Sequence, residues 1–117
     1  IVDFKTGNSI SDWTSSMKGY KYRQQLYYYK ILIEGSRTWR SYTVTDARLE
    51  FVEPDDLKNG EPSSPLIIQF NKDDEAKVKN LIQVVWDKIQ KLDLPQTSKY
   101  NKTLQGTKAF ERDLLTN

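Results

Sequence analysis

The chain has 117 residues, of which 37% are apolar and 29% are charged, and its 18 basic and 16 acidic residues leave a net charge of +2. This length suits a single domain with a modest core, and the small net charge neither requires nor excludes a nucleic-acid partner. Because the chain has no Cys and no His, it cannot hold a disulfide, a thiolate zinc site or an iron–sulfur cluster, and any catalysis must rest on carboxylates, Lys or Tyr.

The hydropathy of the sequence gives no sign of a membrane partner. No apolar run approaches the roughly 18 residues of a membrane span, and no signal peptide begins the sequence. The absence of Cys also fits a reducing compartment. We therefore expect a cytoplasmic protein that does not bind membranes.

The first seven residues, Ile1 to Gly7, carry the most informative pattern in the chain. Two β-branched residues precede Asp3, Phe4 and Lys5, and a glycine ends the run, which is typical of the end of a buried strand. Side chains alternate along a strand, so Asp3 and Lys5 point to the same face, roughly 7 Å apart. An apolar strand with no preceding Met predicts a fragment cut just upstream of a functional site.

A loop is expected over residues 8–19, with a helical turn near residues 12–17, and a helix is expected over residues 20–34. The helix is indicated by apolar and aromatic residues that recur on one face of a 3.6-residue repeat: Tyr22, Leu26, Tyr29 and Ile33. Gly35 follows directly and is typical of the position just beyond a helix C-terminus.

Two strands and a polar connection are expected next. Residues 47–52 alternate apolar and polar side chains, which predicts a half-buried strand, and residues 66–70 predict a second strand antiparallel to it. Residues 39–44 are aromatic and β-branched, which indicates a short irregular strand. Residues 53–56 break the pattern, and residues 57–64 predict a polar hairpin loop.

The clearest helix follows Asn71. Its first turn is acidic, its last turn is basic, and an apolar stripe of about four turns continues to Leu92 before Pro95 ends the helix. The remaining residues, 96–117, predict a loop and a short helix over residues 108–115. This order predicts one α/β or α+β domain with a mixed β-sheet flanked by helices. Its core would span residues 1–95 and its tail residues 96–117, and its leading elements would be lost.

Asp3 and Lys5 form the first candidate site. A carboxylate beside an ammonium suits the binding of a divalent metal and of an anionic oxygen next to it. A solvated surface ion pair is the alternative interpretation, because Asp-x-Lys recurs by chance in many chains.

The tyrosine-rich helix is the second candidate. Gln25 and Tyr29 are four residues apart and therefore share one helix face. Basic and aromatic side chains around them suit contacts to a phosphate backbone or stacking on bases: Tyr20, Lys21, Tyr22, Arg23 and Lys30. A solvated amphipathic helix with Tyr29 in the core is the alternative. The acidic first turn after Asn71 is interpreted as helix capping, without a metal.

These two stretches together resemble the RecB-like branch of the PD-(D/E)XK nuclease superfamily. In that family a strand ending in D-[YFW]-K-T-G is followed by a helix that begins with Q-L-x-x-Y. The matching stretches here are Asp3-Phe4-Lys5-Thr6-Gly7 and Gln25-Leu26-Tyr27-Tyr28-Tyr29. Residues 48–54 and 86–89 are also similar to the C-terminal nuclease segment of UvrD/Rep-like or AddB-like helicase–nucleases. The resemblance covers most of the chain, and its specific motifs lie within residues 1–29.

The resemblance implies a restriction-endonuclease-like core that hydrolyses DNA phosphodiesters with Mg²⁺ or Mn²⁺ during DNA repair or recombination. A helicase domain would lie in the same parent chain. Asp3 and the backbone carbonyl of Phe4 would ligate the metal, and Lys5 would orient the attacking water or stabilise charge developing at phosphorus. Gln25 and Tyr29 would support the site and contact DNA, and the neighbouring basic and aromatic residues would bind it: Lys21, Tyr22, Arg23 and Lys30.

One departure from the family limits this expectation. The family's acidic or His-bearing helix and its Asp on the preceding strand have no counterpart in this sequence. One carboxylate makes a poor Mg²⁺ site, so we expect that these 117 residues alone do not cut DNA. Two alternatives stay open. One is a degenerate nuclease-fold module that binds DNA or a partner subunit without cutting. The other is an interaction domain in which Asp3 and Lys5 form a structural ion pair.

Overall fold

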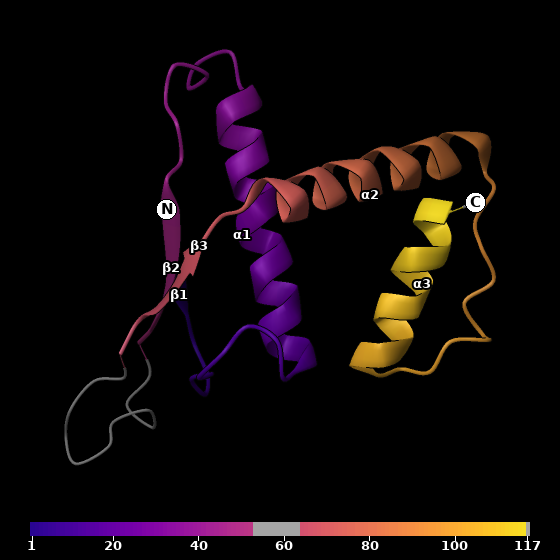
Figure 1. Ribbon diagram of the computed structural model, residues 1–117, viewed down its shortest axis with the longest axis horizontal. Coiled ribbons are helices and arrows are strands. Elements are labelled where there is room, and N and C mark those ends of the chain that lie inside the picture. The colour runs from indigo at the N-terminus through magenta and orange to yellow at the C-terminus, as the bar shows by residue number, and fades with distance from the viewer. Residues whose placement is uncertain (53–63, 117) are drawn as a thin grey trace. The chain divides into compact units, whose positions relative to one another are not determined.

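The computed structural model describes residues 1–52 and 64–116. Over these residues the fold is α+β, with three helices and a mixed three-stranded sheet (Figure 1). The elements follow in the order β1 (Val2–Lys5), α1 (Met17–Gly35), β2 (Asp46–Phe51), β3 (Leu66–Gln69), α2 (Lys72–Lys91) and α3 (Leu104–Thr116). The chain forms two compact units, Ile1–Asn71 and Lys72–Asn117. The boundary between these two units lies before α2.

The sheet of the first unit has the order β1-β2-β3. β1 pairs with β2 in parallel, with Val2 opposite Arg48, and α1 makes the crossover that a parallel connection requires. β2 pairs with β3 in the antiparallel sense, with Ala47 opposite Ile68, which confirms the antiparallel pair expected from the sequence. β1 and β3 are consequently the two edges of the described sheet.

One face of the sheet is buried and carries the core of this unit. Ala47 and Leu49 are fully buried, whereas Arg48 between them is exposed, as the two-residue period of a strand requires. On α1 the fully buried side chains are Leu26 and Tyr27. The expected apolar face of this helix is therefore correct at Leu26, but it omitted Tyr27.

Tyr27 is buried because it ties α1 to the end of β3. Its hydroxyl accepts a hydrogen bond from the backbone N–H of Asn71 at 3.0 Å, and its ring meets the edge of the Phe70 ring with centroids 4.9 Å apart. Because a buried tyrosine usually needs a partner for its hydroxyl, this backbone N–H supports the full burial of Tyr27.

The N-terminus of α1 lies three residues earlier than expected, at Met17. Ser16 is the N-cap, and its hydroxyl accepts a hydrogen bond from the backbone N–H of Gly19. A side chain at Gly19 would bring its Cβ within 2.8 Å of the carbonyl oxygen of Asp12, so a glycine is needed where the preceding loop packs on the helix. At the other end the helix includes Gly35, and Ser36 is the C-cap.

The irregular strand expected over residues 39–44 is wrong. Residues 37–41 form turns, and residues 42–45 belong to no helix or strand. The backbone N–H groups of Arg40 and Tyr42 donate to the carbonyls of Ser36 and Trp39 at 2.9 Å, so local turns take the hydrogen bonds that a strand would have used. Nearly all of the hairpin loop expected over residues 57–64 lies outside the described residues.

The second unit pairs α2 with α3. Leu81 of α2 and Leu114 of α3 are its buried leucines. α2 ends at Lys91 rather than continuing to Pro95, because Leu92 adopts a left-handed conformation with φ of 54°. The N–H of Asp93 then donates to the carbonyl of Lys88 at 3.0 Å, which closes the helix as a Schellman motif.

α3 begins at Leu104, four residues before the expected helix. The preceding segment is fixed to it by Tyr100, whose hydroxyl donates to Oδ2 of Asp113 at 2.7 Å. This hydrogen bond lowers the pKa of the Asp113 carboxyl below its usual range. Within the described part of the chain, no helix combines the length and the apolar character needed to cross a membrane.

The orientation of the sheet gives a stability prediction. Leu49→Ala removes a fully buried side chain and should lower the free energy of unfolding by about 2–5 kcal/mol. Ile67→Ala, on the neighbouring strand, removes a side chain that is 54% exposed, so it should cost roughly 1 kcal/mol or less. Urea denaturation of both variants measures the difference. Equal losses would contradict the assignment of the buried face.

Candidate functional site

The centre of the candidate site is the ammonium group of Lys5 at the end of β1. Its Nζ donates a hydrogen bond to Oε1 of Gln25 at 2.6 Å and lies 3.0 Å from Oδ2 of Asp3. The ring of Tyr22 completes the surroundings, with its centroid 4.5 Å from Nζ. Asp3 and Lys5 share a strand face, as predicted, and α1 lies over that face and supplies the other two groups. The structure therefore brings the two sequence motifs together.

The Asp3–Lys5 pair is largely withdrawn from water. The Lys5 side chain is 17% exposed and the Asp3 side chain 15% exposed. Oδ2 of Asp3 is buried, and within residues 1–52 and 64–116 no group donates a hydrogen bond of good geometry to it. Its contact with Lys5 is thus an ion pair without hydrogen-bond alignment. A buried carboxylate oxygen in this state lacks part of the solvation that it would have in water.

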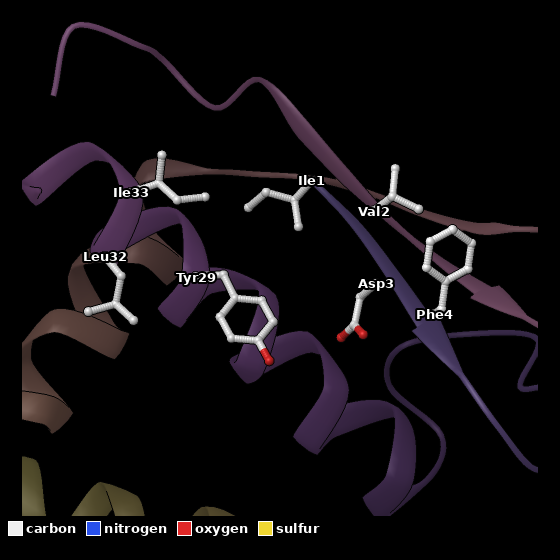
Figure 2. Close-up of a pocket in the computed structure, with 7 residues that line it drawn as sticks. All are labelled: Ile1, Val2, Asp3, Phe4, Tyr29, Leu32 and Ile33. Atoms are coloured by element: carbon white, nitrogen blue, oxygen red, sulfur yellow. The ribbon is translucent and has the colours of Figure 1, made fainter. Parts of the chain in front are cut away.

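A groove of about 510 Å³ lies beside this carboxylate, between β1 and the C-terminal half of α1. Figure 2 shows the side chains of Asp3 and Tyr29 extending into the space between the strand and the helix. The remaining lining residues are mostly apolar: Ile1, Val2, Phe4, Leu32 and Ile33. Tyr29 is therefore near Asp3, as expected, while Gln25 one turn earlier reaches Lys5.

The backbone of β1 places the carbonyl of Phe4 on the open edge of the sheet. The carbonyls of Ile1 and Lys5 accept hydrogen bonds from β2, from the N–H of Arg48 at 3.0 Å and of Val52 at 3.1 Å. Alternate carbonyls of a strand point the same way, so the carbonyl of Phe4 points away from β2. It lies at an edge with no neighbouring strand in the described sheet, so the oxygen is positioned to accept an external ligand.

These groups match the donor chemistry of a hard cation. Oδ2 of Asp3 meets the Lys5 ammonium without hydrogen-bond alignment, and the carbonyl of Phe4 adds a second oxygen on the same strand. Mg²⁺ is commonly held by one or two carboxylates, with waters and substrate phosphate completing its shell. In the described residues no group of three or more His, Cys, Asp or Glu gathers at one place. Asp3 and the carbonyl of Phe4 are therefore the groups of this site that could hold a divalent metal.

The basic and aromatic residues of α1 do not form one surface. Lys21 is exposed, but Tyr22 lies against Lys5, and the guanidinium of Arg23 lies 5.2 Å from the centroid of the Tyr27 ring. Lys30 is only 8% exposed and donates to Oε2 of Glu34 at 2.6 Å. The other oxygen of Glu34 accepts from the backbone N–H of Val44 at 2.9 Å. Lys30 thus serves the packing of α1, and Lys21 is the residue of this set that faces water.

Sequence reasoning missed one basic residue near the site, Lys18. Its Nζ donates to the backbone carbonyl of Asn8 at 2.6 Å and lies 5.8 Å from the centroid of the same Tyr22 ring that contacts Lys5. Lys18 precedes Tyr22 by four residues, so helical spacing could have identified the pair had the helix been expected to begin before Tyr20.

The loop before α1 is held by the carboxylate of Asp12. It accepts hydrogen bonds from the hydroxyl and the backbone N–H of Ser15 and from the backbone N–H of Thr14, all between 2.7 and 2.9 Å. These bonds, the Ser15 hydroxyl first, lower the pKa of the Asp12 carboxyl. On β3, the carbonyl of Ile67 accepts from Nε1 of Trp13 at 3.1 Å. The Asp12 bonds thus hold the loop together just before α1, and the Trp13 bond attaches the loop to β3.

Comparison of the chain with protein-family models, with curated proteins and with solved structures finds no match in any of the three. The geometry of the site and the motifs in the sequence therefore carry the functional argument.

The buried ion pair gives a second stability prediction. Lys5→Met should cost on the order of 2 kcal/mol, because it leaves the Asp3 carboxylate buried without its cation. Adding Asp3→Asn to Lys5→Met should restore part of this loss, because the amide carries no charge. A double-mutant cycle measured by urea denaturation tests the coupling. Additive losses from the two substitutions would show that the pair is not coupled.

Proposed function

We propose that this chain contributes the Asp3–Lys5 part of a metal-dependent DNA nuclease site, within a helicase–nuclease of DNA repair or recombination. The observation that supports it best is the hydrogen bond of 2.6 Å between Lys5 and Gln25, which are 20 residues apart in the sequence. This bond joins the two motifs on which the resemblance to the RecB-like PD-(D/E)XK nucleases depends.

The proposed site uses Asp3 and the carbonyl of Phe4 as ligands of Mg²⁺ or Mn²⁺. A bound divalent metal supplies the activation of water and the neutralisation of charge at phosphorus. The oxygen of Asp3 without a hydrogen-bond donor supports this role, because a cation would satisfy it. The groove beside Asp3 is lined mainly by apolar side chains and by the ring of Tyr29, so it suits a sugar or base of the bound strand while the phosphate lies at Lys5.

Lys5 supplies a fixed positive charge to the reacting phosphate. Its ammonium has three N–H donors, and Gln25 and the ring of Tyr22 fix its position at the strand end. When a phosphate enters, Lys5 exchanges the carboxylate of Asp3 for a phosphoryl oxygen and remains charge-paired. A donor that is oriented before the reaction stabilises developing charge without reorganising, which is the basis of its effect on rate.

A second candidate function is DNA or partner binding without cleavage. Its support is that no group of three or more His, Cys, Asp or Glu side chains gathers within the described residues. A cation held by one carboxylate and one carbonyl binds weakly. We accordingly propose that the 117-residue chain does not cut DNA by itself, and that cleavage belongs to the full-length protein.

A nuclease assay on the full-length protein with Mg²⁺ or Mn²⁺ tests the proposal. Lys5→Met should lower the cleavage rate by roughly 100- to 1,000-fold, the usual effect of removing an oriented transition-state donor. Asp3→Asn should lower it by a similar factor, because it removes the charged metal ligand. Lys102→Met, an exposed lysine before α3, serves as the matched control and should cleave normally. Cleavage by all variants at the wild-type rate would refute the catalytic assignment.

A further inference from the structure

Lys18 occupies the first turn of α1, immediately beside the candidate site. Its side chain is half-buried, and its Nζ is fixed by the carbonyl of Asn8 at 2.6 Å. Two aromatic rings flank the ammonium, Tyr22 at 5.8 Å and Phe51 at 5.9 Å from Nζ to the ring centroids. Three contacts from three segments of the chain therefore hold one lysine in place.

The sign of this charge is unusual for its position. The N-terminal turn of a helix favours negative side chains, because the macrodipole is positive there. The first turn of α1 contains no acidic residue and carries Lys18 instead. Residues that oppose a local preference yet are held by several contacts are expected at functional sites.

In the part of the chain that the structure describes, no carboxylate pairs with the positive charge of Lys18. Lys5 is paired with the carboxylate of Asp3, whereas the groups that hold Lys18 are a carbonyl and two rings without formal charge. The two ammonium groups contact the same Tyr22 ring, at 4.5 and 5.8 Å from its centroid, so both positive charges border one side chain. An anion with more than one charged group fits this arrangement.

The turn between β1 and the loop leaves space beside Lys18. Gly7 has a φ of +92°, a conformation that favours glycine, and a Cβ at this position would lie 4.0 Å from Nζ of Lys18. Because Gly7 has no side chain, the chain turns after β1 beside the ammonium of Lys18 without covering it.

We propose that Lys18 binds a backbone phosphate of a nucleic-acid strand, next to the phosphate held at Lys5. The inference rests on the proposed function for the class of ligand. One strand carries a charged phosphate at every nucleotide, so a single strand offers a phosphate to each of the two lysines. Both ammonium groups contact the ring of Tyr22.

Binding of a fluorescent single-stranded oligonucleotide to the 117-residue chain, measured by anisotropy in EDTA over a series of salt concentrations, tests this assignment. Lys18→Met removes the charge and keeps an apolar stem against the rings. Loss of one phosphate contact should weaken binding about fivefold near 0.1 M salt and reduce the slope of log K against log salt by about 0.7. Lys102→Met is the control and should leave both quantities unchanged.

A second variant separates charge from packing. Lys18→Gln can still donate to the carbonyl of Asn8 but is neutral, so it should show the same loss as Lys18→Met, whereas Lys18→Arg should retain binding. Wild-type affinity and slope in Lys18→Gln would overturn the proposal, and so would a wild-type chain that does not bind the oligonucleotide. EDTA removes the metal from the assay, so a loss here with no cleavage by the full-length protein would support the phosphate contact while refuting the nuclease.

Discussion

The contact between Lys5 and Gln25 is the interaction on which the rest of the site depends. It joins the edge strand β1 to the middle of α1, and it fixes an ammonium beside the carboxylate of Asp3. Strand and helix otherwise present only apolar and aromatic side chains to the groove between them, with the hydroxyl of Tyr29 added. Because the Asp3–Lys5 pair is largely buried, each of its charges is stabilised by the other. The site therefore holds its geometry before any ligand binds.

Much of this site follows from two simple periods in the sequence. The two-residue period of a strand places Asp3 and Lys5 on one face, and the four-residue spacing of a helix places Gln25 and Tyr29 on another. The meeting of the two faces depends on tertiary packing. The same limit explains Lys30, whose charge suggested a surface role although Glu34, one helical turn away, pairs with it in a buried position. Lys18 was missed because the helix begins three residues before the apolar pattern does.

The helices and strands could be predicted where the apolar period is long and uninterrupted. They were harder to predict where local backbone hydrogen bonds decide where an element begins or ends. β2, β3 and α2 are close to their expected positions, because their alternation or stripe persists over several residues. Residues 39–44 carry strand-forming side chains, but turns that start at Ser36 take their hydrogen bonds. α2 ends at Lys91 because Leu92 adopts a left-handed conformation, and a leucine does not predict that conformation. The chain divides before α2 because α2 pairs with α3. This is a tertiary contact, which local sequence patterns do not specify.

We predict that one protein carboxylate, Asp3, recruits a divalent cation to the end of β1. Titration of Mn²⁺ into the 117-residue chain, followed by the electron paramagnetic resonance signal of free Mn²⁺, measures this directly. The chain should bind Mn²⁺ weakly at a site that Asp3→Asn abolishes and that Asp87→Asn, on the exposed face of α2, leaves intact. Mn²⁺ binding by Asp3→Asn that equals binding by the wild-type chain would contradict the central claim.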